Sequence, residues 1–173
     1  MNVRLIIWFV AVTGVFATSI RGETHFARDH VFLYQPDAPL QARLASAGDL
    51  AAYIVRLQAV GTAYFASEKT PEILDVVVGV KPGKKVKIWL ISSRRSGEDK
   101  TLAALHKKLD AVPACAVRQG PVAFALRWLI PSDAFHLSQQ ELFKRPMPKE
   151  WRDAAGGRDV LVPDGIFARI WPD

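Results

Sequence analysis

The sequence predicts a single α+β domain in which two main helices pack on a mostly antiparallel sheet. Strand patterns indicate the sheet, because apolar residues alternate in a hairpin over 73–93 and again in a strand over 121–130. Apolar residues at helical spacing predict the two helices, over 49–67 and 99–112. Half of the residues are hydrophobic and 23% are charged, which is typical of a globular chain and excludes a disordered one.

The N-terminal segment has the order of a secretory signal peptide, which we assign to residues 1–19. Arg4 precedes an uncharged apolar run over 5–16, and small residues follow. A short membrane anchor is the alternative, although the apolar stretch over 5–20 has sixteen residues and a spanning helix needs about 20. We therefore expect residues 20–173 to form one exported domain, periplasmic or secreted, with no integral membrane span if the leader is cleaved.

Both predicted helices have recognisable ends. Asp49 is a suitable N-cap for the first helix, and Thr70-Pro71 stops it. The second helix is opened by Ser96-Gly-Glu-Asp99 and ended by Pro113. A short strand is expected earlier, over 31–34.

The hairpin is the clearest local prediction. One of its faces is formed by alternate residues of the two strands: Val76, Val78, Val80, Val86, Ile88 and Leu90. Between the strands, Pro82 and Gly83 suit the two central positions of a type II turn that begins at Lys81. Trp89 points to the opposite face, and we expect it to pack in the core against the two helices.

The C-terminal part is less regular. The strand over 121–130 places alternate apolar residues on one side: Val122, Phe124, Leu126 and Trp128. After it, residues 148–155 predict a short helix and residues 165–171 a closing strand.

Basic residues gather at the two ends of the returning hairpin strand. They are the candidate partner-binding residues: Lys81, Lys84, Lys85, Lys87, Arg94 and Arg95. With a net charge of +6, they favour contact with an envelope protein or an anionic surface. Lysines at a turn also protect a sheet edge from self-pairing, which is the alternative interpretation. Nucleic acid is not expected as a partner, because the sequence contains no recognition motif for it.

No residue pattern indicates catalysis, a metal site or a cofactor. The spacing of zinc ligands is absent from the four histidines, His25, His30, His106 and His136. The sequence has neither a phosphate-binding loop nor a dinucleotide fingerprint. Cys115 is the only cysteine, and its apolar neighbours predict burial.

We therefore expect a non-enzymatic binding module. An exported, hydrolase-like enzyme with a site assembled from distant residues is the alternative, and a pocket lined by two of the histidines would favour it. A structural subunit whose tail from Pro131 docks on a neighbouring molecule is a third hypothesis.

The order helix, strand, strand, helix, strand resembles the TonB C-terminal domain family over residues 74–129. The motifs that carry the resemblance are VVVGVKPGKKVKIWLISS over 76–93, TLAALHKKL over 101–109, Pro113-Ala114, and Gly120-Pro121-Val122 leading to Phe124. The resemblance implies a small exported domain that binds other proteins through a strand edge. The chain departs from the family in three ways: Lys100-Thr101-Leu102 replaces the usual Leu-Asp helix opening, no proline-rich spacer is present, and 131–173 has no counterpart.

Overall fold

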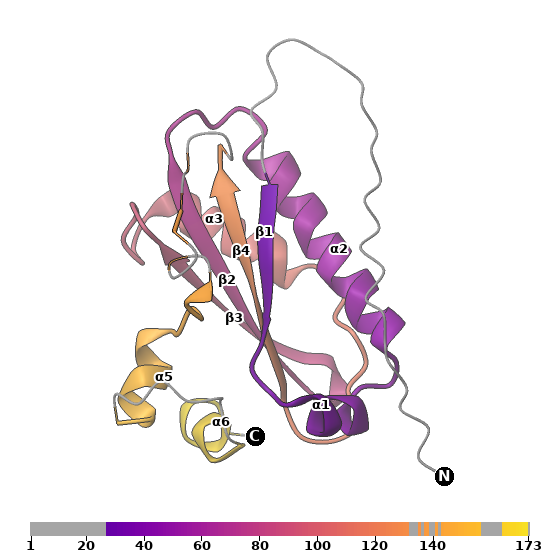
Figure 1. Cartoon of the computed structure of the whole chain (residues 1–173). Helices are drawn as coiled ribbons and strands as arrows, with labels where there is room; N and C mark the ends of the chain where they lie inside the picture. The colour runs from indigo at the N-terminus through magenta and orange to yellow at the C-terminus, as the bar shows by residue number, and fades with distance from the viewer. Residues whose placement is uncertain are drawn as a thin grey trace.

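Figure 1 shows the computed structural model of the chain, which describes residues 27–131, 135, 137, 138, 141, 143–156 and 164–172. The predicted signal peptide over 1–19 lies outside these residues. The strands are β1 (Ala27–Leu33), β2 (Glu72–Lys81), β3 (Lys85–Ser92) and β4 (Val122–Ile130). They form one antiparallel sheet in the order β1-β4-β2-β3, so the predicted fold class is confirmed, together with the hairpin and the strand after it.

Helices lie on both sides of this sheet. They are α1 (Asp37–Arg43), α2 (Ala47–Tyr64), α3 (Lys100–Asp110), α5 (Lys149–Ala154) and α6 (Asp164–Ile170). The two longest, α2 and α3, cover one face as predicted, whereas α5 and α6 lie on the other side (Figure 1). Within the described part of the chain, no helix combines the length and the apolar character that crossing a bilayer requires.

The face of the sheet that α2 and α3 cover carries the larger hydrophobic core. It is built from the alternate apolar residues that the sequence predicts, and its largest fully buried side chains are Tyr53, Leu57, Phe65, Leu74, Leu105, Leu109, Phe124, Leu126 and Trp128. Tyr53 of α2 meets Phe124 of β4 edge to face, with ring centroids 5.9 Å apart. Each such side chain contributes about 1.5–3 kcal/mol by leaving water.

The first long helix begins earlier than predicted. Ser46, and not Asp49, is its N-cap, because the Ser46 hydroxyl accepts a hydrogen bond of 3.0 Å from the Asp49 N–H. The Asp49 carboxylate instead accepts a 2.7 Å bond from the Ala116 N–H and so fixes the loop before β4. For α3 the predicted opening is correct, since Asp99 caps the N–H groups of Thr101 and Leu102.

The hairpin turn uses one residue more than a two-residue turn. Gly83 adopts φ 78° and ψ 15°, close to the values that the second central residue of a type II turn requires. Lys84 also has a positive φ of 60°, and the strands resume with Lys81 opposite Lys85. The positive φ at glycine was predictable, whereas the one at Lys84 was not.

The second face of the sheet is covered by the C-terminal segment. Trp151 of α5 is fully buried at its centre and makes edge-to-face contacts with Tyr34, Trp89 and Phe167, at centroid distances of 5.2, 4.9 and 5.2 Å. The expectation that Trp89 packs against the two main helices is therefore wrong, because those helices lie on the opposite face. The described residues of α5 and α6 pack on this face of their own sheet.

The predicted closing strand over 165–171 is also wrong, since this segment is the helix α6. Ile166 and Phe167 are buried and Ile170 is half-buried, a spacing that places all three on one side of a helix. The short helix predicted over 148–155 is confirmed as α5.

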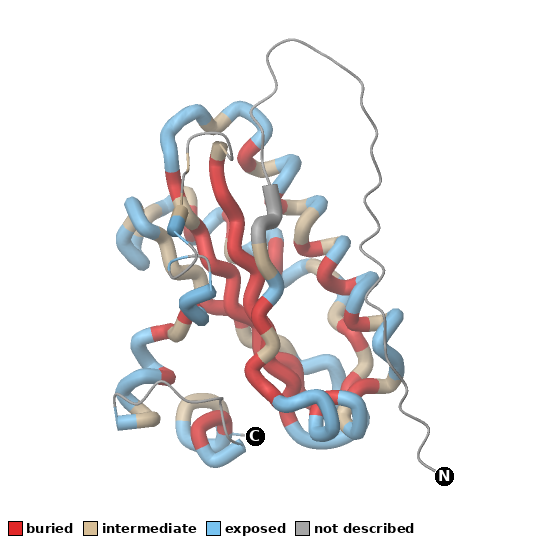
Figure 2. Tube along the Cα trace, in the orientation of Figure 1, coloured by how far each residue is buried: buried red, intermediate tan, exposed pale blue. Residues whose placement is uncertain are grey.

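Small residues on the second face make room for these aromatic rings. Beneath the C-terminal segment lie four residues that carry little or no side chain beyond Cβ: Val77, Gly79, Ala123 and Ala125. As a result, β4 is buried along its whole length and β2 along nearly all of it (Figure 2). A sheet with two apolar faces needs a cover on each.

Replacing Gly79 with alanine is expected to lower the free energy of unfolding by about 1–3 kcal/mol, as overpacking does. The added Cβ would lie 2.9 Å from Phe167 Cε1 and 3.3 Å from Trp171 Cζ3. Urea denaturation followed by tryptophan fluorescence measures the change. Gly97→Ala is the control, because no atom lies within 4 Å of a Cβ placed there. Equal stability of the two variants would contradict the close packing of α6 on β2.

Candidate functional site

The β2–β3 hairpin and the residues just after it carry the six basic residues that the sequence singles out, and the structure gives them different surroundings. Lys81 and Lys87 are tied to the C-terminal segment. Lys81 Nζ donates to the Trp171 carbonyl at 2.6 Å and lies 4.9 Å from the centre of the Trp171 ring. Lys87 Nζ donates to Glu150 Oε2 at 3.1 Å and to the Ile170 carbonyl at 3.2 Å. These two lysines therefore hold the cover of the second face.

Lys84 and Lys85 differ from them, because both are exposed at the turn. The predicted cluster of four lysines thus contributes two ammonium groups that extend into solvent at this end of β3.

The two arginines at the other end of β3 belong to an ion-pair network. Glu72 is fully buried; it is paired with Arg95, and Ser92 Oγ donates to it at 2.5 Å. Arg95 also contacts Glu68 at 2.7 Å, and its side chain is 7% exposed. Arg94 lies further out, 39% exposed and 3.5 Å from Glu68. Arg95 is thus a structural residue, and Arg94 is the more accessible of the two.

The outer edge of β3 is the remaining part of the hairpin that can meet a partner. Ser93 N–H donates to the Ile73 carbonyl at 2.9 Å, so the pairs that exchange hydrogen bonds with β2 are the odd-numbered residues of β3. The even-numbered residues Val86, Ile88 and Leu90 therefore direct their N–H and C=O groups away from the sheet. Sequence reasoning did not identify this edge by residue, because the strand order was not predictable.

One of these outward groups has a partner within the described chain. His106 of α3 contacts the Ile88 carbonyl through Nε2 at 2.9 Å and the Asp110 carboxylate through Nδ1 at 2.8 Å. Both partner atoms, a carbonyl oxygen and a carboxylate oxygen, are hydrogen-bond acceptors. No other hydrogen bond to the outward groups of Val86, Ile88 and Leu90 occurs among the residues that the structure describes.

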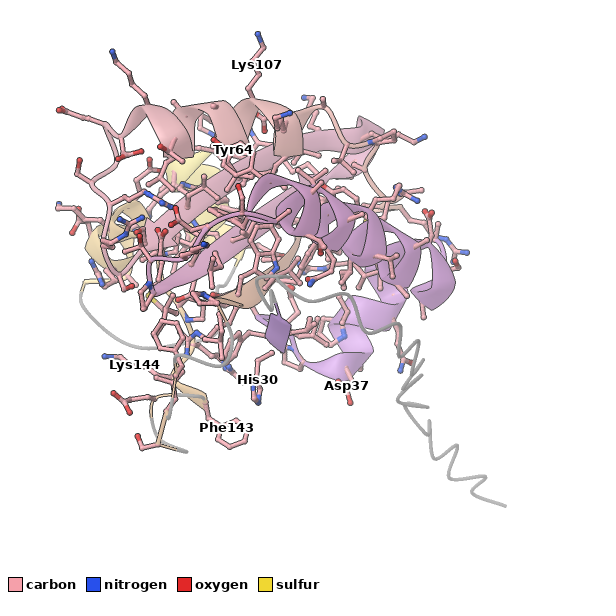
Figure 3. The ribbon with its side chains drawn as sticks, turned by 90° about the horizontal axis from the view of Figure 1, so that it is seen from above. His30, Asp37, Tyr64, Lys107, Phe143 and Lys144 are labelled. Atoms are coloured by element: carbon pink, nitrogen blue, oxygen red, sulfur yellow. The ribbon has the colours of Figure 1, made fainter. Side chains whose placement is uncertain are left out.

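The histidines do not converge. His30 lies on the second face, where its ring packs against the rings of Phe32 and Phe143. The ring centroids are 5.9 and 5.0 Å apart, respectively. His106 belongs to α3, on the other side of the sheet; Figure 3 labels its neighbour Lys107 on that helix, far from His30. His25 and His136 lie outside the described residues. Among the residues described, no group of three or more metal-binding side chains occurs.

A buried ion pair on the second face was missed by sequence reasoning. Asp75 and Arg127 are opposite each other on β2 and β4, with Arg127 Nε 2.7 Å from Oδ1 and Nη2 2.9 Å from Oδ2. Burial raises the pKa of Asp75, and the bonds and charge of Arg127 oppose that rise. Arg127 Nη1 also donates to the Glu141 carbonyl at 2.5 Å. The signal was present as one charged residue inside each apolar strand, but the pairing needs the register.

Arg95→Gln is expected to lower the free energy of unfolding by about 3 kcal/mol, because it leaves the buried carboxylate of Glu72 with only the more distant guanidinium of Arg94, 3.8 Å away, among the described residues. Arg94→Gln is the matched control and should change it by less than about 1 kcal/mol, as for an exposed ion pair. Urea denaturation measures both. Similar small effects would mean that the network does not stabilise this end of the hairpin.

Cys115 is buried, as predicted. Burial and the nearby Asp49 raise the pKa of its thiol to about 11. Since the thiolate is the reactive form, we expect iodoacetamide at about pH 8 to alkylate the native protein at least ~100-fold more slowly than the urea-unfolded protein. Intact-mass spectrometry over time measures this ratio. Rapid alkylation of the native protein would contradict the burial.

Comparison of the chain with protein-family models, with curated proteins and with solved structures finds no match.

Proposed function

We propose that this protein is a non-enzymatic binding module of the cell envelope that adds an extended, acidic segment of a partner protein to the outer edge of β3. The observation that carries the proposal is the row of outward backbone groups at Val86, Ile88 and Leu90 on an edge strand. An edge of this kind binds an extended segment by extending the ladder of main-chain hydrogen bonds.

The charges around this edge favour an acidic partner. Lys84 and Lys85 are exposed where β3 begins, and Arg94 is accessible just after it ends. A second copy of this chain would bring the same cations to the same edge, and like charges that face each other across strands are destabilising. The edge is therefore suited to a different chain with carboxylates near both ends of its bound segment.

A protein segment fits these features better than a lipid surface does. The outward N–H and C=O groups of β3 alternate along the strand, and an extended peptide presents the complementary groups at the same spacing. A layer of anionic head groups would satisfy the cations alone. His106 marks where the ladder would form, because a partner N–H that binds the Ile88 carbonyl would take the place of its Nε2.

Two further considerations support the envelope location and the mode of binding. The leader pattern over 1–19 supports export. The resemblance to the TonB C-terminal domain family over 74–129 implies the same use of a strand edge, although the chain lacks the spacer of the transducing members.

Peptides selected from a phage-displayed random library on the full chain provide the probe. We expect the selected peptides to be acidic and to bind with extended backbones. Val86→Pro should weaken their binding at least tenfold, because proline removes an outward N–H and keeps the hydrogen bonds that face β2. Isothermal titration calorimetry measures the affinity, and circular dichroism verifies that the variant is folded.

Val31→Pro is the matched control, since Val31 is an outward-facing residue of the other edge strand, β1. In the unmodified protein, bound peptide should also slow amide hydrogen exchange at Val86, Ile88 and Leu90, a measurement that needs no variant. Equal binding to both proline variants with no protection of β3, or binding to anionic vesicles but to no peptide, would overturn the proposal.

A further inference from the structure

A second exposed surface lies beside β1, the edge strand at the opposite side of the sheet from β3. It is formed by Phe143, Lys144 and Arg145, which together we call the tip. The Phe143 side chain is 62% exposed, and its ring meets the ring of His30 edge to face at a centroid distance of 5.0 Å. Figure 3 shows Phe143 and Lys144 projecting on the same side of the molecule. The tip therefore presents an aromatic ring to solvent beside two basic side chains.

A single exposed apolar side chain is common on a protein surface, but this one belongs to a segment that is held at both ends. Before the tip, Arg127 Nη1 donates to the Glu141 carbonyl at 2.5 Å. After the tip, the hydroxyl of Tyr34 donates to the Pro146 carbonyl. Both donors are buried residues of the sheet region. The tip is thus already formed in the free protein, and little further ordering is needed when it binds a partner.

The cations of the tip are available to an anionic partner. Lys144 and Arg145 are exposed, and neither forms a hydrogen bond or an ion pair within the described part of the chain. The carboxylate of Glu141 is bound elsewhere, because it accepts hydrogen bonds from the N–H and the hydroxyl of Ser138 at 3.0 and 2.7 Å. Two positive charges therefore lie next to the exposed ring with no carboxylate paired to them among the described residues.

We propose that the tip binds the surface of an anionic phospholipid membrane, with the Phe143 ring at the boundary of the acyl chains and with Lys144 and Arg145 at the head groups. An aromatic ring beside basic residues suits this interface, because the ring leaves water while the cations meet anionic lipid. An acidic peptide is recognised at a groove or a strand edge. A projecting ring provides neither, whereas it inserts readily into a lipid layer.

This surface goes beyond the binding function proposed for the outer edge of β3. The tip lies beside β1, and the strand order β1-β4-β2-β3 places β1 and β3 at opposite edges of the sheet. A membrane and an extended peptide are therefore bound at separate places, and the peptide-binding edge is presented at the membrane surface.

The test is co-sedimentation of the full chain with vesicles made of equal parts phosphatidylglycerol and phosphatidylcholine, compared with vesicles of phosphatidylcholine alone. We expect binding to the anionic vesicles and not to the neutral ones. Phe143→Ser should weaken this binding about tenfold or more, because the buried ring is lost. Lys144→Gln should weaken it about fivefold, the effect of one basic residue near an anionic surface.

Two variants on the other side of the sheet are matched controls. Val55→Ser removes an apolar side chain of α2 that is also 62% exposed. Lys107→Gln removes an exposed lysine of α3, which Figure 3 shows on the opposite side of the molecule from Lys144. Each should change the affinity for anionic vesicles by less than about twofold, since exposed charges far from the contact are screened. Circular dichroism verifies that all four variants are folded.

A measurement on the unmodified protein locates the contact without any variant. A spin-labelled lipid in anionic bicelles should broaden the backbone amide resonances of the tip more than those of Val86, Ile88 and Leu90. Val86→Pro should leave vesicle binding unchanged, so failure of the peptide-binding proposal does not affect this test. No binding to anionic vesicles, equal binding to neutral ones, equal losses in the tip variants and their controls, or broadening centred on β3 would each overturn the proposal.

Discussion

The requirement to cover two apolar sheet faces determines most of this structure. Because β2 and β4 are central strands that are mostly apolar and carry apolar residues on both faces, neither face is stable in water. The helices α2 and α3 cover one face, and the aromatic residues of the C-terminal segment cover the other. Gly79 and the alanines of β4 permit the second cover to lie close to the sheet. What remains for partners is an edge strand and the tip beside the opposite edge.

The parts of the fold that were predictable depend on short-range patterns. Alternation of apolar residues defines the hairpin, and apolar residues at helical spacing define each long helix, since both patterns follow from local geometry. The errors lie where a short segment satisfies two patterns. Asp49 and Ser46 are both good N-caps, and the apolar residues of 165–171 fit a strand as well as one side of a helix. Tertiary packing decides such cases, as it does for Trp89, whose cover comes from residues about sixty positions later.

The sequence predicts which basic residues belong to the candidate site, but not which of them are exposed. Six basic residues on one hairpin are visible in the sequence, but the C-terminal segment binds Lys81 and Lys87, and acidic residues before and within β2 bind Arg95. The pairing of Asp75 with Arg127 depends on the register of β2 with β4. In each case the partner is far along the chain, so the sequence predicts the cation and not its neighbour.

Because α5 and α6 cover the second face of the sheet and come last in the described chain, that face is covered last when the chain folds during synthesis. Strand β1 pairs with β4, so the sheet closes only after a long stretch of chain has been synthesised, and such non-local pairing is slow. Trp151 and Phe167, which cover the second face, come later still. A chain that emerges from its N-terminal end therefore exposes an apolar sheet face until its last segment arrives. During that interval the exposed apolar surface makes the chain prone to aggregation.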